Sequence, residues 1–203
     1  MIKFGLWLLF TLVLCLGCAP RTAYQLHIRK YQRGKLNEDT STVYQLPYIA
    51  GTAHRVIEGY YSHFTHRYRA ALDFKMEEGT PVCAIADGIV IRTKDDSNSG
   101  GMKYMYKPYG NYVIIGHNDS TRSSYRHLLY HSVIVHPGDS VHSGQIIAKS
   151  GMTGYTFTPH LHFLIAQLQD GEWNSIPCRF YTKSFTGYLK PLKKYESINS
   201  QQR

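Results

Sequence analysis

The chain has 203 residues, of which 43% are hydrophobic, with a formal net charge of +9 and a pI of about 9.3. This length supports one packed domain with terminal extensions. Tyrosine and glycine are both common (17 each), and no long segment has helical periodicity, which favours a β-rich fold. The charge predicts an anionic partner, but the basic residues are scattered and no nucleic-acid-binding motif is present, so nucleic acid is not expected.

The N-terminus has the composition of an export signal. A short positive region (1–3) precedes the apolar run 4–17, which predicts a signal peptide over residues 1–17. The run 14–18, Leu-Cys-Leu-Gly-Cys, resembles a bacterial lipoprotein cleavage site in which Cys18 is lipidated and anchors the chain to a membrane. Cys15 stands where leucine is usual, so a soluble exported form and an uncleaved anchor are the alternatives. We expect a protein of the cell envelope, in the periplasm or anchored to the outer membrane.

The remainder divides by composition into a tether (18–43), a domain (44–185) and a basic polar tail (186–203). The cysteines of the domain are Cys83 and Cys178. An exported compartment permits a disulfide between them, but Cys83 lies in an apolar run and is expected to be a buried core residue. Neither cysteine has a Cys-x-x-Cys partner, which argues against a Cys/His zinc knuckle.

The first strong strand pattern covers residues 71–76. Its alternation places Asp73 on one face and Leu72 and Phe74 on the other, towards a core. Taken alone, this pattern predicts a solvent-facing Asp73, preceded by two loop histidines, His63 and His66.

Further strands are expected along the rest of the domain, separated by turns rich in glycine and proline. The polar and aromatic segment 93–110 between two of them is interpreted as a loop that forms one wall of a substrate groove. A tight turn is expected at Asp170–Gly171. The expected strands are 82–85, 88–92, 111–117, 124–129, a hairpin over 133–148, a strand that begins near His160, and a closing edge segment over 173–180.

The pair His160 and His162 lies inside an apolar run that predicts a strand. Residues two apart on a strand point to the same face, so both imidazoles would face one pocket. One ring could then bind a metal while the other handles protons. An ordinary polar strand face is the simpler interpretation of this pair on its own.

Four motifs in this order match one family, together with the segment Val135-His136-Pro137-Gly138-Asp139 between the third and the fourth. They are Thr65-His66 followed by Ala71-Leu72-Asp73-Phe74, Gly79-Thr80-Pro81-Val82 followed by Ala86-Asp87-Gly88, Tyr125-Arg126-His127-Leu128, and Pro159-His160-Leu161-His162-Phe163. Across residues 59–168 the sequence resembles the lysostaphin/LytM-type zinc endopeptidases, which cut peptide cross-links in bacterial peptidoglycan. The domain over 44–185 is therefore expected to be a zinc metallopeptidase with peptidoglycan as its partner.

The resemblance implies a mainly β fold, an antiparallel β-sheet groove of the duplicated hybrid motif type with few short helices. It implies Zn²⁺ bound by His66, Asp73 and His162, with His63 as the alternative to His66. It also implies catalytic roles for His127 and His160. Many family members place the first histidine four residues before the aspartate, where this chain has Arg69; Thr65-His66 fits a branch with a longer insert.

General zinc chemistry agrees with this ligand set, because a catalytic zinc uses three protein N or O ligands and keeps one position open for water. A catalytically inactive relative that binds the cell wall or regulates other hydrolases is the main alternative. Such a protein typically lacks ligands, whereas all five functional positions are present here. A third hypothesis is a lipoyl-type or sugar-phosphotransferase carrier, which would have no use for an export signal or for Asp73.

Overall fold

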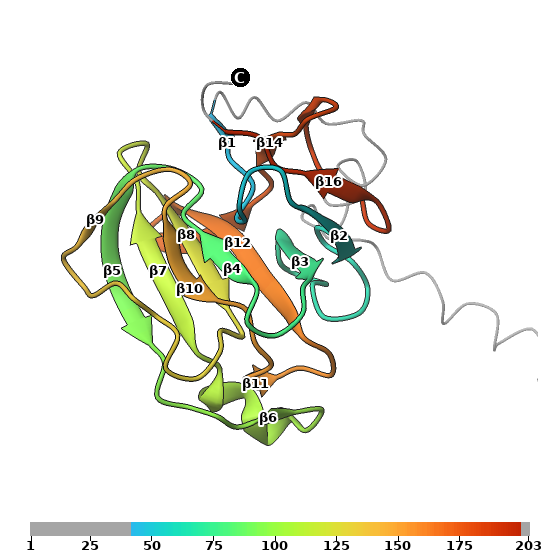
Figure 1. The fold of residues 1–203 in the computed structure, drawn as a ribbon, viewed down its shortest axis with the longest axis vertical. Coiled ribbons are helices and arrows are strands. Elements are labelled where there is room, and N and C mark those ends of the chain that lie inside the picture. Colours follow the sequence, from blue (N-terminus) through green and yellow to red (C-terminus); the bar gives the residue numbers. More distant parts are fainter. Residues whose placement is uncertain (1–41, 200–203) are drawn as a thin grey trace, which may run out of the picture. The chain divides into compact units, whose positions relative to one another are not determined.

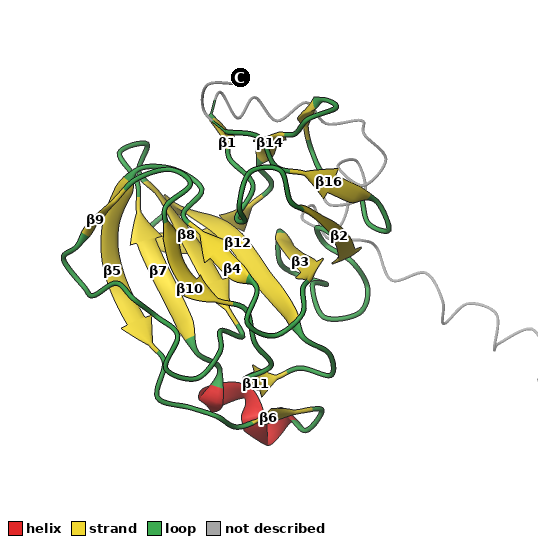
Figure 2. Cartoon of the chain, in the orientation of Figure 1, coloured by secondary structure: helices red, strands yellow, loops and turns green. Residues whose placement is uncertain are grey.

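The computed structural model describes residues 42–199, which all belong to one compact unit, Asp39–Arg203. The expected signal peptide (1–17), Cys18 and almost all of the expected tether (18–43) lie outside the described residues. Within residues 42–199 the chain forms sixteen strands and one short 3-10 helix (Figures 1 and 2). The predicted β-rich class with few helices is confirmed.

The largest sheet has nine strands, and every paired neighbour in it is antiparallel. Its strands are β2 (Ala53–Glu58), β3 (Ala71–Lys75), β5 (Gly88–Lys94), β7 (Tyr112–Gly116), β8 (Thr121–Arg126), β9 (Ser140–Val141), β12 (His160–Gln169), β13 (Glu172–Ile176) and β16 (Lys194–Glu196). Their order is β16-β2-β3-β12-β8-β7-β5-β9, and β13 pairs with the second half of β12 (Figure 1). The predicted antiparallel sheet is confirmed.

The ten-residue strand β12 lies inside this sheet, between β3 and β8. Its side chains alternate between two faces, as strand geometry requires. Leu161 and Phe163 are buried on the core side, where the Phe163 ring packs against the rings of Phe74 and Tyr125 at centroid distances of 6.4 and 5.4 Å. The residues that alternate with Leu161 and Phe163 therefore point to the opposite face of the sheet.

A two-stranded sheet of β4 (Pro81–Cys83) and β10 (Ile146–Lys149) overlies the main sheet in Figure 1. Ile85, just after β4, donates its backbone N–H to the hydroxyl of Tyr125 on β8 at 3.0 Å. Val82 and Ile147 of this layer are fully buried, whereas Ile146 at the start of β10 is exposed. The core therefore fills one face of the main sheet and leaves the other face for a site.

The pairing of these segments differs from the sequence prediction. Residues 133–148 do not form a hairpin, because β9 pairs with β5 and β10 pairs with β4. Local turn signals mark where strands end but leave the partner undetermined, which long-range packing decides. The turn at Asp170–Gly171 is confirmed, since both residues have positive φ (52° and 80°) and connect the antiparallel pair β12–β13.

The predicted groove loop 93–110 contains β6 (Gly100–Gly101) and the 3-10 helix η1 (Tyr104–Tyr109). β6 pairs in parallel with β11 (Gly154–Tyr155), which immediately precedes the turn into β12. A Cβ on Gly100 would lie only 1.9 Å from the carbonyl oxygen of Met152, so this close approach requires glycine. The pairing attaches the loop to the end of the sheet where β12 begins.

Residues 186–199 depart from the expected polar tail. They contain β15 (Thr186–Gly187), which pairs with β14 (Arg179–Tyr181), and β16, which forms the edge of the main sheet beside β2. β14 also pairs with β1 (Val43–Tyr44). The buried ring of Tyr195 explains the difference, because its hydroxyl bonds to both the N–H and the carbonyl of Lys190 and closes the segment on itself. Charged residues lie between these contacts, so the sequence shows no hydrophobic alternation that would predict these strands.

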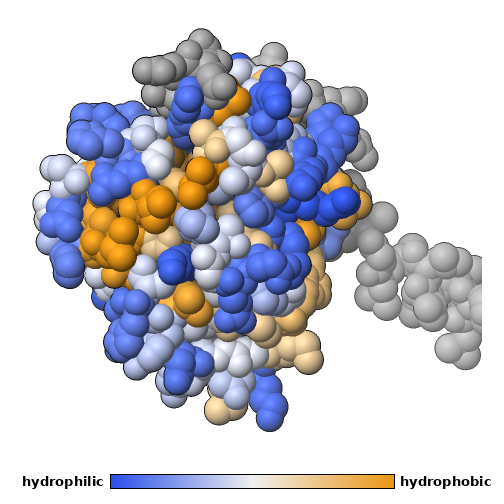
Figure 3. All heavy atoms as spheres, viewed as in Figure 1, coloured by the Kyte–Doolittle hydropathy of each residue, from blue (hydrophilic) through white to orange (hydrophobic). Residues whose placement is uncertain are grey.

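Cys83 and Cys178 are both buried free thiols. The prediction that Cys83 is a buried core residue is confirmed. No helix among residues 42–199 is long and apolar enough to span a membrane. The face in Figure 3 carries an apolar patch on the side where β5 and β9 lie in Figure 1. Most of the remaining surface in this view is polar.

Candidate metal centre and active site

Strand register brings Asp73 and His162 together. Asp73 on β3 lies directly opposite His162 on β12, and residues opposite each other in an antiparallel pair share a face with adjacent Cβ atoms. His162 Nδ1 is 2.8 Å from Asp73 Oδ1, and both side chains are buried. Asp73 is therefore not the solvent-facing residue that its strand pattern alone predicts.

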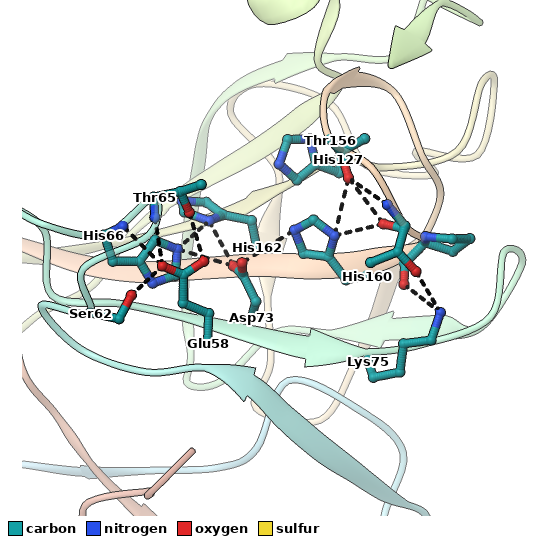
Figure 4. Close-up of polar contacts among 12 residues, drawn as sticks. Glu58, Ser62, Thr65, His66, Asp73, Lys75, His127, Thr156, His160 and His162 are labelled. Atoms are coloured by element: carbon teal, nitrogen blue, oxygen red, sulfur yellow. Dashed lines mark hydrogen bonds and ion pairs between the residues drawn. The ribbon is translucent and has the colours of Figure 1, made fainter. Parts of the chain in front are cut away.

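His66 reaches the same point from the loop between β2 and β3 (Figure 4). Its Nε2 lies 3.3 Å from Asp73 Oδ1 and 3.2 Å from His162 Nδ1, and the residue is fully buried. His66 Nδ1 donates to the carbonyl of Gly59 at 3.2 Å, which leaves the Nε2 lone pair directed at Asp73 and His162. His63, the sequence alternative, is exposed and belongs to neither of the possible metal-binding groups among residues 42–199.

Glu58 at the end of β2 anchors the His66 loop, and no sequence motif identified it. Its carboxylate accepts hydrogen bonds from the backbone amides of Thr65 (2.7 Å) and His66 (3.1 Å) and from the hydroxyls of Ser62 and Thr65 (Figure 4). Burial raises the pKa of Glu58, but these hydrogen bonds outweigh it and leave the pKa below its usual value. A carboxylate directly after the apolar pair Val56-Ile57, shortly before Ser62 and Thr65, is the signal that would have found it.

The donor atoms of His66, Asp73 and His162 lie within 4.8 Å of one another. Burial raises the pKa of Asp73, but its contacts with His162 and His66 lower it well below its usual range. Burial lowers the pKa of His162, whereas Asp73 and Glu58 raise the pKa of His66 although burial opposes them. Two imidazole nitrogens and one carboxylate oxygen fit the ligand set of a catalytic zinc, and zinc binding displaces any proton on His66.

His160 and His127 form a second pair beside this cluster, with ring centroids 4.8 Å apart. His160 Nδ1 donates to the carbonyl of Thr158 at 2.8 Å, and its Nε2 is 3.5 Å from Asp73 Oδ2. His127 follows β8 with a φ of 62°, and its Nδ1 donates to the carbonyl of Thr153 at 2.7 Å. In both rings Nε2 is therefore the nitrogen left for chemistry.

The environment keeps His127 neutral. Burial, followed by the nearby His160 and His162, lowers the pKa of His127 to about 3. His127, His160 and His162 also offer nitrogens within 4.8 Å of one another, so His162 belongs to both groups that could hold a metal. Only the group with Asp73 contains the carboxylate that balances the charge of a cation.

Asp73, His127, His160 and His162 line an open cleft of about 730 Å³, and the fully buried His66 lies behind Asp73 and His162. Its walls are the His66 loop, the predicted groove loop 93–110 through Tyr104 and Lys107, and the segment 155–157. Aromatic pairs form along the walls: Phe64 with Phe157, and Tyr104 with Tyr155, at centroid distances of 5.2 and 6.0 Å. The volume of the cleft and its aromatic walls suit a peptide ligand.

His117, at the end of β7, lies outside the cleft lining and outside both metal groups. Its Nδ1 contacts the carbonyl of Asp87 at 2.8 Å and its Nε2 contacts Ser123 Oγ at 2.8 Å. Ser123 continues to the hydroxyl of Tyr125, so this network supports the core below the sheet.

Comparison with known proteins identifies the class. The model of Peptidase family M23 matches residues 67–174, and the chain belongs to this family. It is 44% identical over 93 residues to lysostaphin of Staphylococcus simulans, and 39% identical over 92 residues to the peptidoglycan DD-endopeptidase ShyA of Vibrio cholerae. Each alignment covers 45% of this chain and only 17% and 18% of the respective relative. The chain thus spans about a fifth of the length of the curated relatives it matches.

Two solved structures are similar to part of this chain. The catalytic domain of lysostaphin from Staphylococcus simulans aligns with 68% of this chain and 87% of its own, at 29% identity and a TM-score of 0.43. A zinc-containing peptidase from Vibrio cholerae aligns with 65% of this chain and 37% of its own, at 26% identity and a TM-score of 0.41.

Proposed function

We propose that this protein is an exported, zinc-dependent endopeptidase that hydrolyses peptide bonds in the stem peptides or cross-links of peptidoglycan. His66, Asp73 and His162 hold the zinc. The observation that carries the proposal is the convergence of these three donors at the floor of a cleft that His127 and His160 also line. Family membership and the peptidoglycan endopeptidases among the relatives support the reaction and substrate class. The predicted signal peptide and Cys18 support export.

The chain's own residues supply the proton chemistry. When bound, zinc supplies Lewis-acid polarisation of the scissile carbonyl and lowers the pKa of water towards about 7. The Nε2 atoms of His160 and His127 face the cleft with lone pairs, so either ring accepts a proton as the water oxygen bonds to the carbonyl carbon. The same proton then passes to the leaving amine as the C–N bond breaks. Asp73 Oδ2, 3.5 Å from His160 Nε2, stabilises the transient imidazolium on His160.

The test is digestion of peptidoglycan sacculi by the purified protein, with and without a chelator, followed by separation of the released muropeptides. His162→Ala removes a proposed ligand, and His142→Ala, an exposed histidine outside both metal groups, is the matched control. We expect loss of cross-linked muropeptides that requires both metal and His162 and is unchanged in His142→Ala.

Bound zinc is measured in the same samples. One zinc per chain without release of muropeptides would contradict hydrolysis of this substrate. Neither zinc nor release would overturn the enzyme hypothesis and favour a catalytically inactive relative that binds the wall or regulates other hydrolases.

A further inference from the structure

The charged side chains that line the cleft carry an excess of positive charge. Four of them are cationic, Arg67, Arg69, Lys107 and Arg126. Asp73 is the only carboxylate in the lining, and its oxygens face His162, His66 and His160. A concave surface with one sign of charge concentrates its field and attracts the opposite charge. The cleft is therefore suited to bind an anionic group in addition to a peptide backbone.

Arg126 lies beside the proposed zinc ligands because of strand register. It is directly opposite His162 in the β8–β12 pair, so both side chains emerge on the cleft face with adjacent Cβ atoms. Its Nε donates to Ser124 Oγ at 3.1 Å, and its guanidinium lies 5.4 Å from the ring centroid of Tyr112. These contacts orient the side chain and leave the terminal NH₂ groups available for a ligand.

Arg69, in the His66 loop, lines the same cleft as Arg126. Burial, and then the charge of Arg69, lower the pKa of the Arg126 guanidinium, as expected for two like charges on one cleft wall. No ion pair joins either side chain to a carboxylate within the described range 42–199. An anion between the two guanidinium groups would relieve this repulsion and form charge-assisted, bidentate hydrogen bonds.

We propose that Arg69 and Arg126 form a subsite for a free carboxylate on a substrate residue that flanks the scissile bond. This inference rests on the proposed function and narrows its substrate class to acidic peptides. Arg126 is paired with a proposed zinc ligand, so the carboxylate it binds belongs to a residue next to the cleaved bond and not to a distant part of the polymer. A neutral or amidated peptide lacks the group that these two side chains bind.

The test uses pairs of cross-linked stem peptides that are identical except that their carboxyl groups near the cross-link are free in one and amidated in the other. Wild-type protein is expected to show kcat/KM about 10- to 100-fold higher for the acidic member, the range for a hydrogen bond to a charged group. The preference should decrease at high salt. Most of this preference should disappear in Arg126→Gln and in Arg69→Gln. In both variants kcat/KM should fall for the acidic peptide and change little for the amidated peptide.

Arg92→Gln is the matched control, because Arg92 is an exposed arginine on β5 outside the cleft lining and its loss changes the net charge equally. The backbone bonds of Arg69 to His66 and Tyr61 persist in Arg69→Gln, and zinc content and thermal unfolding verify that each variant is folded. Equal kcat/KM for the two peptides in wild type, or a preference that survives in the double variant, would overturn the inference.

A binding measurement separates this inference from the proposed function. Calorimetry of wild type and Arg126→Gln with both peptides, in the presence of chelator, requires no hydrolysis. If neither peptide is cleaved but wild type binds the acidic one at least tenfold more tightly, the proposed reaction fails and the carboxylate subsite stands. Equal affinities overturn the subsite whatever the activity.

Discussion

The carboxylate of Glu58 accepts a hydrogen bond from the backbone amide of His66 at 3.1 Å and two more from Thr65. It therefore determines where the His66 loop lies, although it is not one of the proposed zinc ligands. Partners of this kind typically change metal affinity by about 10- to 100-fold. We predict a loss of this size for Glu58→Ala, measured by competition with a chromophoric chelator. Glu78→Gln, at an exposed acidic residue, should match wild type. Unchanged zinc affinity in Glu58→Ala would show that the loop holds its position by other contacts.

The two histidines of the loop provide a matched pair of substitutions. His66 is fully buried with Nε2 3.3 Å from Asp73 Oδ1, whereas His63 is exposed. We predict that His66→Ala abolishes stoichiometric zinc binding and muropeptide release, and that His63→Ala retains both. Zinc per chain, measured by atomic absorption, is the readout. The reverse pattern would assign the ligand to His63.

Tyr125 links the two layers of the fold. Its fully buried hydroxyl accepts the N–H of Ile85 at 3.0 Å and a hydrogen bond from Ser123 at 3.1 Å. Tyr125→Phe leaves the Ile85 N–H buried without a partner, at a cost of about 1–3 kcal/mol in the free energy of unfolding. Urea denaturation measures this loss, and Tyr109→Phe, at an exposed tyrosine, should lose less than about 0.5 kcal/mol. Equal stability of the two variants would contradict the role of this hydroxyl.

Asp119 should make stability depend on acid pH. Burial raises its pKa, but hydrogen bonds from Thr121 and from Tyr44 (2.5 Å) outweigh this and lower it. A carboxylate with a lowered folded-state pKa stabilises the protein above its unfolded pKa of about 3.9, and this contribution is lost as pH falls through the folded pKa. Because Asp119 is solvent-exposed, water screens its interactions, so we expect Asp119→Asn to be less stable than wild type by only about 0.5 kcal/mol at pH 7 and to approach wild type near pH 3. Urea titrations at both pH values measure the difference in free energy of unfolding between wild type and Asp119→Asn. A difference that does not change with pH would contradict the prediction.

The β class, the antiparallel sheet and most strand positions could be predicted from local patterns. The alternation over 71–76 and the apolar run around His160 and His162 are strong signals, because apolar side chains recur at every second position on the core side of each strand. The partners of β4, β9 and β10 could not be predicted, since pairing depends on packing between distant segments. The strands after residue 186 were missed because they are short and depend on Tyr195 and Lys190 rather than on a hydrophobic pattern.

The candidate site was predictable to a similar degree. Motif order pointed to His66, Asp73, His127, His160 and His162, and these five side chains all lie at the cleft or its floor. Glu58 and the pairing of Arg126 with His162 were not predictable, because they depend on loop conformation and on register. A pattern within one strand contains neither kind of information.

On strand β12 the core side chains Leu161 and Phe163 alternate with His160 and the proposed zinc ligand His162. A shift of one residue would carry Leu161 and Phe163 into the cleft and the histidines into the core, so the strand cannot adjust in small steps. The histidines leave their positions only when the sheet itself opens. Heat should therefore abolish metal retention in the same transition that melts the domain, with no range of temperature in which a folded protein has a loosened site.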